Sequence, residues 1–146
     1  MAERDVVLFK NAERRRCVLS VSMPAYRDFR LVLHSPHGRL AGTGIDLFEA
    51  LVDVRRRLEP SGWRIAVHGS RRQAFASGLM RDMHGAMRVY ICEPDRWPRR
   101  SDLVDIFGEA PTAEITTVVE QAAWVYAWIE ARRRALPRGR DSSRES

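Results

Sequence analysis

The sequence predicts a single α+β domain in which a mixed sheet of about five strands carries two main helices on one face. Its length of 146 residues is typical of one domain, and 45% hydrophobic residues are enough for a buried core. Apolar residues alternate with polar ones early in the chain and recur at helical spacing later. We expect the order β-β-β-α-β-α-β-α over residues 1–136 and a disordered basic tail at 137–146.

The first third of the chain predicts an antiparallel run of three strands. Residues 5–10 are mostly apolar, and the polar stretch 11–15 is suited to a turn. In residues 17–23 and 29–34, every second side chain is apolar, which places one set on a buried face. Residues 35–44 contain a proline and three glycines, and we expect a loop there, with a short strand around Leu40 as the alternative.

Helical signals follow this loop. Asp46 and Glu49 have the spacing of a capping box, and the apolar residues after them share one face until Pro60. This pattern predicts a helix over residues 46–59. A right-handed crossover through that helix would place a strand at 63–68 parallel to the strand at 28–34.

The second half of the sequence predicts two more helices and a fifth strand. Ser70 is suited to cap a short helix that Gly78 ends, and residues 86–92 form the last strand. An irregular segment over residues 93–111 precedes a long final helix over 112–136. One apolar stripe of this helix would cover the sheet; its residues are Ile115, Val118, Val119, Ala122, Tyr126 and Ile129.

Two tryptophans lie on the opposite face of the final helix. Aromatic anchors beside small residues are typical of protein contact surfaces. We therefore expect an interface, either between two copies of the chain or with another protein, at Trp124, Ala127, Trp128 and Ala131. The alternative is that residues 93–111 fold over this face and bury both rings within the monomer.

The turn at residues 67–72 is a second candidate site. A strand that enters a helix through a Gly-Ser turn leaves backbone N–H groups free to bind an anion. Arg71 and Arg72 in a first helical turn would oppose the helix dipole, and a bound anion would offset that cost. The candidate pocket for phosphate or carboxylate consists of His68, Gly69, Ser70, Arg71, Arg72, Arg81 and His84. The alternative is a solvated turn.

The sequence points to no metal, cofactor or catalytic residue. Phosphate-loop, dinucleotide, zinc-protease and hydrolase motifs are absent. Cys17 and Cys92 lack metal-ligand spacing, and we expect reduced, mostly buried thiols. His34 and His37 on an extended segment would point to opposite faces.

The net charge of +6 raises the question of nucleic-acid binding. The chain has three arginine triplets, at 14–16, 55–57 and 132–134, which would spread around a helix or turn rather than form a flat patch. No nucleic-acid-binding module is recognisable in the sequence. The absence of a long apolar run or an apolar N-terminus favours a cytoplasmic protein that does not enter a membrane.

The sequence therefore favours a cytoplasmic, non-catalytic binding or accessory protein. It would act through a protein-partner surface on its C-terminal helix, as a homodimer or with another protein. Two alternatives stay open. One is a small-molecule, phosphate or carboxylate module, or a small enzyme, built at residues 68–72; the other is a nucleic-acid-binding protein.

Overall fold

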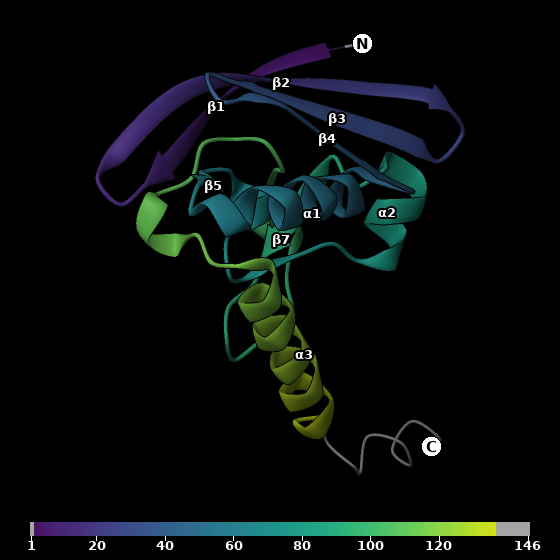
Figure 1. The fold of residues 1–146 in the computed structure, drawn as a ribbon. Coiled ribbons are helices and arrows are strands. Elements are labelled where there is room, and N and C mark those ends of the chain that lie inside the picture. Colours follow the sequence, from purple (N-terminus) through teal and green to yellow (C-terminus); the bar gives the residue numbers. More distant parts are fainter. Residues whose placement is uncertain (1, 137–146) are drawn as a thin grey trace, which may run out of the picture.

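The computed structural model describes residues 2–136 and shows one α+β domain with a curled five-stranded sheet and a small three-stranded sheet (Figure 1). The large sheet has the order β4-β3-β2-β1-β5. Its strands are β1 (Ala2–Lys10), β2 (Glu13–Ala25), β3 (Asp28–Ser35), β4 (Gly38–Gly44) and β5 (Arg64–Ile65). The small sheet consists of β6 (Ala74–Phe75), β7 (Arg88–Ile91) and β8 (Leu103–Asp105). The helices are α1 (Leu47–Leu58), α2 (Gly78–His84) and α3 (Val118–Arg134).

Short 3₁₀ turns connect these elements at Glu59–Ser61, His68–Ser70, Arg100–Asp102 and Thr112–Glu114. The tail predicted at 137–146 lies outside the described residues.

The large sheet is antiparallel throughout, so the prediction of a mixed sheet is wrong. Residues 38–44, expected to be a loop with at most a short strand around Leu40, form the full strand β4 and pair with β3 along its length. This extra strand reverses the chain before α1. As a result β5 runs antiparallel to β1, with Ile65 opposite Leu8, and is not parallel to the strand predicted at 28–34.

Two glycines that suggested a loop instead allow α1 to lie directly against β4. A Cβ atom at Gly42 would lie 2.6 Å from Cγ2 of Val54 and 2.8 Å from the carbonyl oxygen of Ala50. At Gly44 it would lie 2.5 Å from the backbone nitrogen of Ala50. Glycine in a strand often marks such a close approach of another backbone.

The helix predicted at 46–59 is confirmed as α1. The Asp46 side chain accepts a hydrogen bond from the Glu49 N–H at 2.8 Å and caps the helix. Figure 1 shows the large sheet curling over this helix. The core lies between them and includes Leu19, Leu31, Leu33, Leu47, Ala50, Leu51 and Val54.

The second predicted helix is displaced along the chain. Residues 68–70 form a single 3₁₀ turn, and the chain then extends into β6, which pairs with β7. The helix α2 begins at Gly78, the residue expected to end it, because Ser77 rather than Ser70 provides the cap. The Ser77 hydroxyl accepts from the Met80 N–H at 3.2 Å.

The final helix begins later than predicted and takes another direction. Residues 112–114 form a 3₁₀ turn, and α3 starts at Val118 behind a capping box of Thr117 and Glu120. Figure 1 shows α3 leaving the body of the domain instead of lying along the sheet. The prediction that both main helices pack on one face of the sheet is therefore wrong: α1 fills the concave face, while α3 contacts α1 and β6.

Candidate functional site

One tryptophan of the predicted interface is part of the core of the monomer. Trp128 is 3% exposed, and its indole N–H donates to the Glu93 carbonyl at 2.8 Å. Its ring contacts Phe75, Trp97 and Trp124, at centroid distances of 5.6, 5.4 and 6.1 Å. The expectation that Trp128 faces away from the core is therefore wrong. The segment after β7 covers the Trp128 ring, as the alternative stated for both rings, whereas Trp124 is only half-buried.

The other three residues of that predicted interface remain accessible to different degrees. Trp124 stacks on Trp128 and is half-buried, Ala127 is exposed, and Ala131 is half-buried. Without the Trp128 ring, these three residues do not form an aromatic anchor that projects from the surface.

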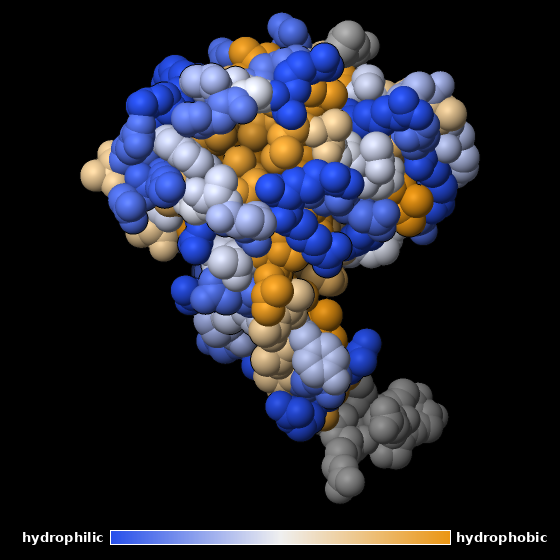
Figure 2. All heavy atoms as spheres, in the orientation of Figure 1, coloured by the Kyte–Doolittle hydropathy of each residue, from blue (hydrophilic) through white to orange (hydrophobic). Residues whose placement is uncertain are grey.

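The open face of α3 includes Val119, Ala122 and Tyr126 of the stripe expected to cover the sheet, whereas Ile115 and Val118 of the same stripe are buried. Val119 and Tyr126 are 77% and 70% exposed, and Ala122 and Ala123 between them are also exposed. The side of α3 turned to the domain instead buries Val118, Gln121 and Trp128. We refer to the exposed apolar face as the open stripe; it consists of Val119, Ala122, Ala123 and Tyr126. Figure 2 shows apolar surface running from the body of the domain along α3.

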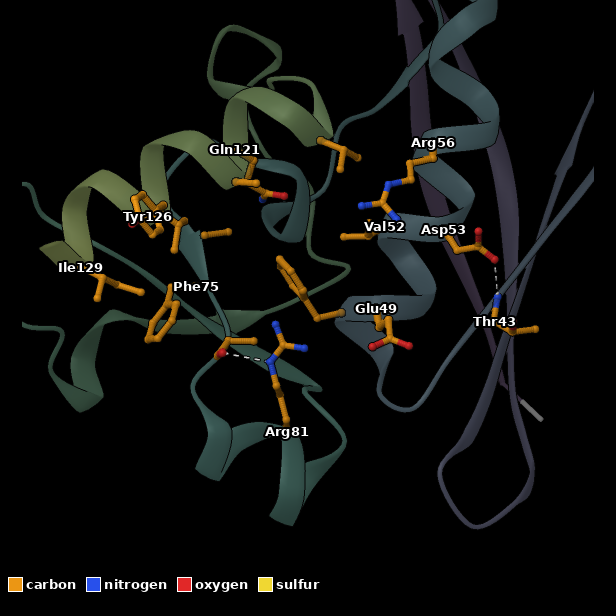
Figure 3. A pocket seen from close by; sticks show the side chains of 16 residues that line it. Thr43, Glu49, Val52, Asp53, Arg56, Phe75, Arg81, Gln121, Tyr126 and Ile129 are labelled. Atoms are coloured by element: carbon orange, nitrogen blue, oxygen red, sulfur yellow. Dashed lines mark hydrogen bonds between the residues drawn. The ribbon is translucent and has the colours of Figure 1, made fainter.

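A groove of about 750 Å³ lies beside the open stripe, between α1 and α3, and β6 and α2 complete its walls (Figure 3). Ala122 and Tyr126 belong to both the groove and the stripe. Its walls are mainly apolar; the larger apolar side chains are Phe48, Val52, Phe75, Val125, Tyr126 and Ile129. Charged side chains stand at its rim, namely Glu49, Asp53, Arg56 and Arg81.

The rim charges differ in how they are compensated. Asp53 accepts from the Thr43 N–H at 3.0 Å and pairs with Arg57. Glu49 accepts from the Ile45 N–H at 3.3 Å.

The two rim arginines contrast with each other. Arg81 donates to the buried carboxylate of Asp46 at 3.0 Å and to the Ala76 carbonyl at 3.1 Å, and lies over the Phe48 ring. Arg56, by contrast, is exposed and has no ion pair or side-chain hydrogen bond among the side chains that the structure describes. It is therefore a solvated cation at the groove.

A buried polar network attaches the start of α3 to α1 and so defines the groove. Arg55 donates to the Gln121 side-chain oxygen at 2.6 Å and to the Thr116 carbonyl at 2.9 Å. The Gln121 amide in turn donates to the carbonyls of Gly69 and Arg71. Burial lowers the pKa of Arg55 to about 10, which still leaves the guanidinium charged at neutral pH.

The candidate anion site at 68–72 lacks the geometry that suggested it. No helix begins at Ser70, and the backbone N–H groups of residues 68–72 donate to carbonyls of the fold. Arg71 pairs with Glu114, its Nη1 lies 3.2 Å from Nδ1 of His68, and Arg72 is exposed. The donors expected to be free for an anion are therefore already used.

The two more distant residues of that site do not complete it. The contacts of Arg81 described above join it to α1 and the groove rather than to residues 68–72. The side chain of His84 lies outside the part of the structure that is described.

The structure also shows where the remaining histidines and cysteines lie. His34 contacts the Ser20 hydroxyl at 3.0 Å, whereas His37 packs near Trp63. Cys17 and Cys92 are buried, and burial raises the pKa of Cys92 to about 12.

Over the described part of the chain, no group of three or more metal-ligating side chains comes together. No helix within residues 2–136 has the length and apolar character needed to cross a membrane.

Compared with known proteins, the sequence matches no family model and no curated protein. Function therefore has to follow from the geometry and chemistry of the groove and the open stripe of α3.

Proposed function

We propose that this chain is a binding or accessory protein whose contact surface for another protein is the open stripe of α3 together with the adjoining groove. The exposure of Val119 and Tyr126, two turns apart on the same face of a projecting helix, is the observation that carries the proposal. The surface thus stays on the C-terminal helix, where the sequence suggested it, but on a different face.

The arrangement matches the way proteins recognise helices. Residues 119, 122 or 123, and 126 have the i, i+3 or i+4, i+7 spacing with which an amphipathic helix presents its anchors to a partner. Single exposed apolar residues are common on protein surfaces, but a continuous apolar stripe beside an apolar groove marks an interaction site. Burying a valine-sized side chain contributes about 1.5–3 kcal/mol.

A protein partner fits this surface better than a small ligand does. A compact ligand could fill the groove between Phe48 and Ile129, but it would leave Val119 in water, because Val119 is not a groove residue. A partner helix could cover the groove and the stripe together. A nucleic acid has less support, since Glu49 and Asp53 stand at the same rim as Arg56.

Site-specific photo-crosslinking in the cells that produce the protein tests this proposal. A photoreactive phenylalanine analogue replaces Tyr126 in the full chain. As a matched control it replaces Tyr26, which is 82% exposed in the turn between β2 and β3. We expect a discrete protein crosslink from position 126 that is absent from position 26.

A second variant shows whether the crosslink depends on the proposed surface. Ala122→Glu places a charge in the middle of the open stripe, where it has room because Ala122 is exposed. It should remove the crosslink from position 126 without unfolding the protein. Equal, diffuse labelling from positions 126 and 26 would contradict a protein-binding role for this face.

A further inference from the structure

We propose that the outer face of the large sheet binds the phosphate backbone of a nucleic acid through Arg14, Arg16 and Arg39. We refer to these three arginines as the basic cluster. The face lies apart from the groove and the open stripe, so the proposal does not depend on the proposed function. Figure 1 shows α1, α2 and α3 on the concave side of the large sheet, and none of these helices covers its outer face.

The strand β2 places two arginines of one triplet on the same face. Residues 14–16 lie in β2 and not in a turn. Because side chains alternate along a strand, Arg14 and Arg16 point outward, whereas Cys17 and Leu19 are buried on the inner face. Two residues along a strand span about 7 Å. The expectation that this triplet would not form a flat patch is therefore wrong for two of its members.

The register of the sheet adds a third arginine to this face. Val18 of β2 lies opposite His34 of β3, and His34 lies opposite Arg39 of β4. Opposite residues on neighbouring strands point to the same side, so Arg39 shares the outer face with Arg14 and Arg16. With strands about 4.8 Å apart and about 3.3 Å per residue, the basic cluster extends about 16 Å from Arg14 to Arg39.

The three strands that carry the basic cluster do not compensate its charge. All three arginines are exposed, and none of them forms an ion pair in the part of the chain that the structure describes. The acidic residues of β2, β3 and β4 already have partners, because Glu13 pairs with Arg15 and Asp28 pairs with Arg30. Three positive charges of this face therefore remain available for an anionic partner.

Three carboxylates limit the extent of this positive surface. Glu3 and Asp5 lie on the outer face of the neighbouring strand β1, and Glu109 lines a shallow hollow beside Arg14. Asp5 stands opposite Val18, and none of the three carboxylates pairs with the basic cluster among the described residues. We therefore expect a bound polyanion to lie over β2, β3 and β4 rather than over β1.

An extended polyanion fits the basic cluster better than a single small anion does. To hold one phosphate ion, the guanidinium groups would have to converge, whereas these arginines are spread over about 16 Å of a convex surface. One strand of a nucleic-acid duplex carries a phosphate every 3.4 Å or so, so about five phosphates can pass across this distance. Arginine also matches phosphate oxygens with two parallel hydrogen bonds.

The same face is poorly suited to a protein or a lipid bilayer as partner. Such partners use large apolar anchors in addition to charge. The neutral side chains that separate the arginines on the outer face are small or only partly exposed; they are Val18, Ser20, Val32 and Ala41. Because phosphates carry no base identity, we expect binding that is independent of sequence and strongly dependent on salt.

Fluorescence anisotropy of the purified full chain with a labelled DNA duplex and a labelled single-stranded RNA tests the proposal. We expect binding at about 50 mM salt, and for three phosphate contacts on the duplex a slope of log affinity against log salt of about −2.7. The triple variant Arg14→Gln, Arg16→Gln and Arg39→Gln should bind about tenfold more weakly or worse, and lose most of this slope. The absence of binding to both probes at about 50 mM salt would overturn the proposal.

A matched triple variant separates this surface from the overall charge. Arg72→Gln, Arg88→Gln and Arg100→Gln change the net charge equally, and these arginines are exposed and lie outside the large sheet. This control should keep the affinity within about twofold and keep the slope. Equal losses in the two triple variants would show that only the net charge matters, and the outer face would then not be the site.

A variant that should bind more tightly guards against losses caused by misfolding. Glu3→Gln together with Asp5→Asn removes the two carboxylates on the neighbouring strand, and we expect about a twofold gain in affinity at low salt. An unchanged or lower affinity would contradict the placement on this face. Binding of the unmodified chain to phosphatidylserine-containing vesicles, but to neither nucleic acid, would overturn nucleic acid as the partner.

Discussion

The guanidinium of Arg55 donates a hydrogen bond to the side-chain oxygen of Gln121 across 2.6 Å, and this contact joins α1 to α3. Both side chains are 2% exposed. The partners of Arg55 are neutral oxygens of Gln121 and Thr116, not a directly bonded carboxylate. Since α1 and α3 both line the groove, this buried bond positions the surface that we propose to bind a partner.

Gln121→Leu should destabilise the fold by about 3 kcal/mol or more, because it leaves part of a buried guanidinium without an acceptor. The double variant Arg55→Met with Gln121→Leu removes donor and acceptor together and should be less destabilised than Gln121→Leu alone. Urea denaturation of the three proteins measures this difference. Purely additive losses would contradict the coupling of the two residues.

Trp128→Ala should cost about 3–5 kcal/mol, because it removes a large buried side chain and its bond to the Glu93 carbonyl. Tyr126→Ala on the same helix should change the stability of the monomer by no more than about 0.5 kcal/mol. Thermal and urea unfolding at low protein concentration compare the two variants. Similar losses for both would contradict the assignment of the buried and open faces of α3.

Gly42→Ala should destabilise the protein by about 1–3 kcal/mol, because the added methyl group would overlap Val54 and the backbone of α1. Gly78→Ala is the matched control. Its Cβ would meet nothing within 4 Å, and alanine is a better helix former at the start of α2. Chemical denaturation should show a loss for the first variant and no loss for the second.

The protein should lose stability as the pH falls below about 6.5, in part through His68. Burial, and then the nearby charge of Arg71, lowers the pKa of His68 in the folded state from its usual 6.5. The contact with Arg71 also needs the neutral ring, because a guanidinium can only donate. The unfolded chain therefore takes up the proton first, and stability falls until the pH reaches the folded pKa.

His68→Gln removes this titration. Its unfolding free energy should fall less between about pH 7 and about pH 5 than that of the unmodified protein, although the variant can be less stable at every pH. Denaturation curves at several pH values give both slopes. Equal slopes for the two proteins would show that His68 does not contribute.

Sequence signals between near neighbours correctly predicted those elements that depend on contacts between near neighbours. Asp46 and Glu49 marked the start of α1 correctly, because a cap depends on residues three apart. The extent of β4 was underestimated, with only a short strand around Leu40 considered, because the contact of Gly42 and Gly44 with α1 lies outside any local pattern. Ser70 has the spacing of a cap, but the residues after it pair with other strands instead.

The open stripe shows a different limit of sequence reasoning. Helical periodicity identified correctly that Val119, Ala122 and Tyr126 share one face, but it could not show which face turns to the domain. The polar residue Gln121 is buried because its side-chain oxygen accepts a hydrogen bond from Arg55 on α1. One signal for the groove was present in the sequence: Phe48 and Val52 lie four apart on α1, on the flank of its core face.

The central claim is that the open stripe of α3 is a protein contact surface, and hydroxyl-radical footprinting inside the producing cells tests it most directly. Tyr126 and Tyr26 are similarly exposed in the single chain, so each serves as a reference for the other. Our account predicts that Tyr126 is oxidised much less than Tyr26 in cells, and equally in the dilute purified chain. Equal oxidation of the two tyrosines in cells would contradict the claim.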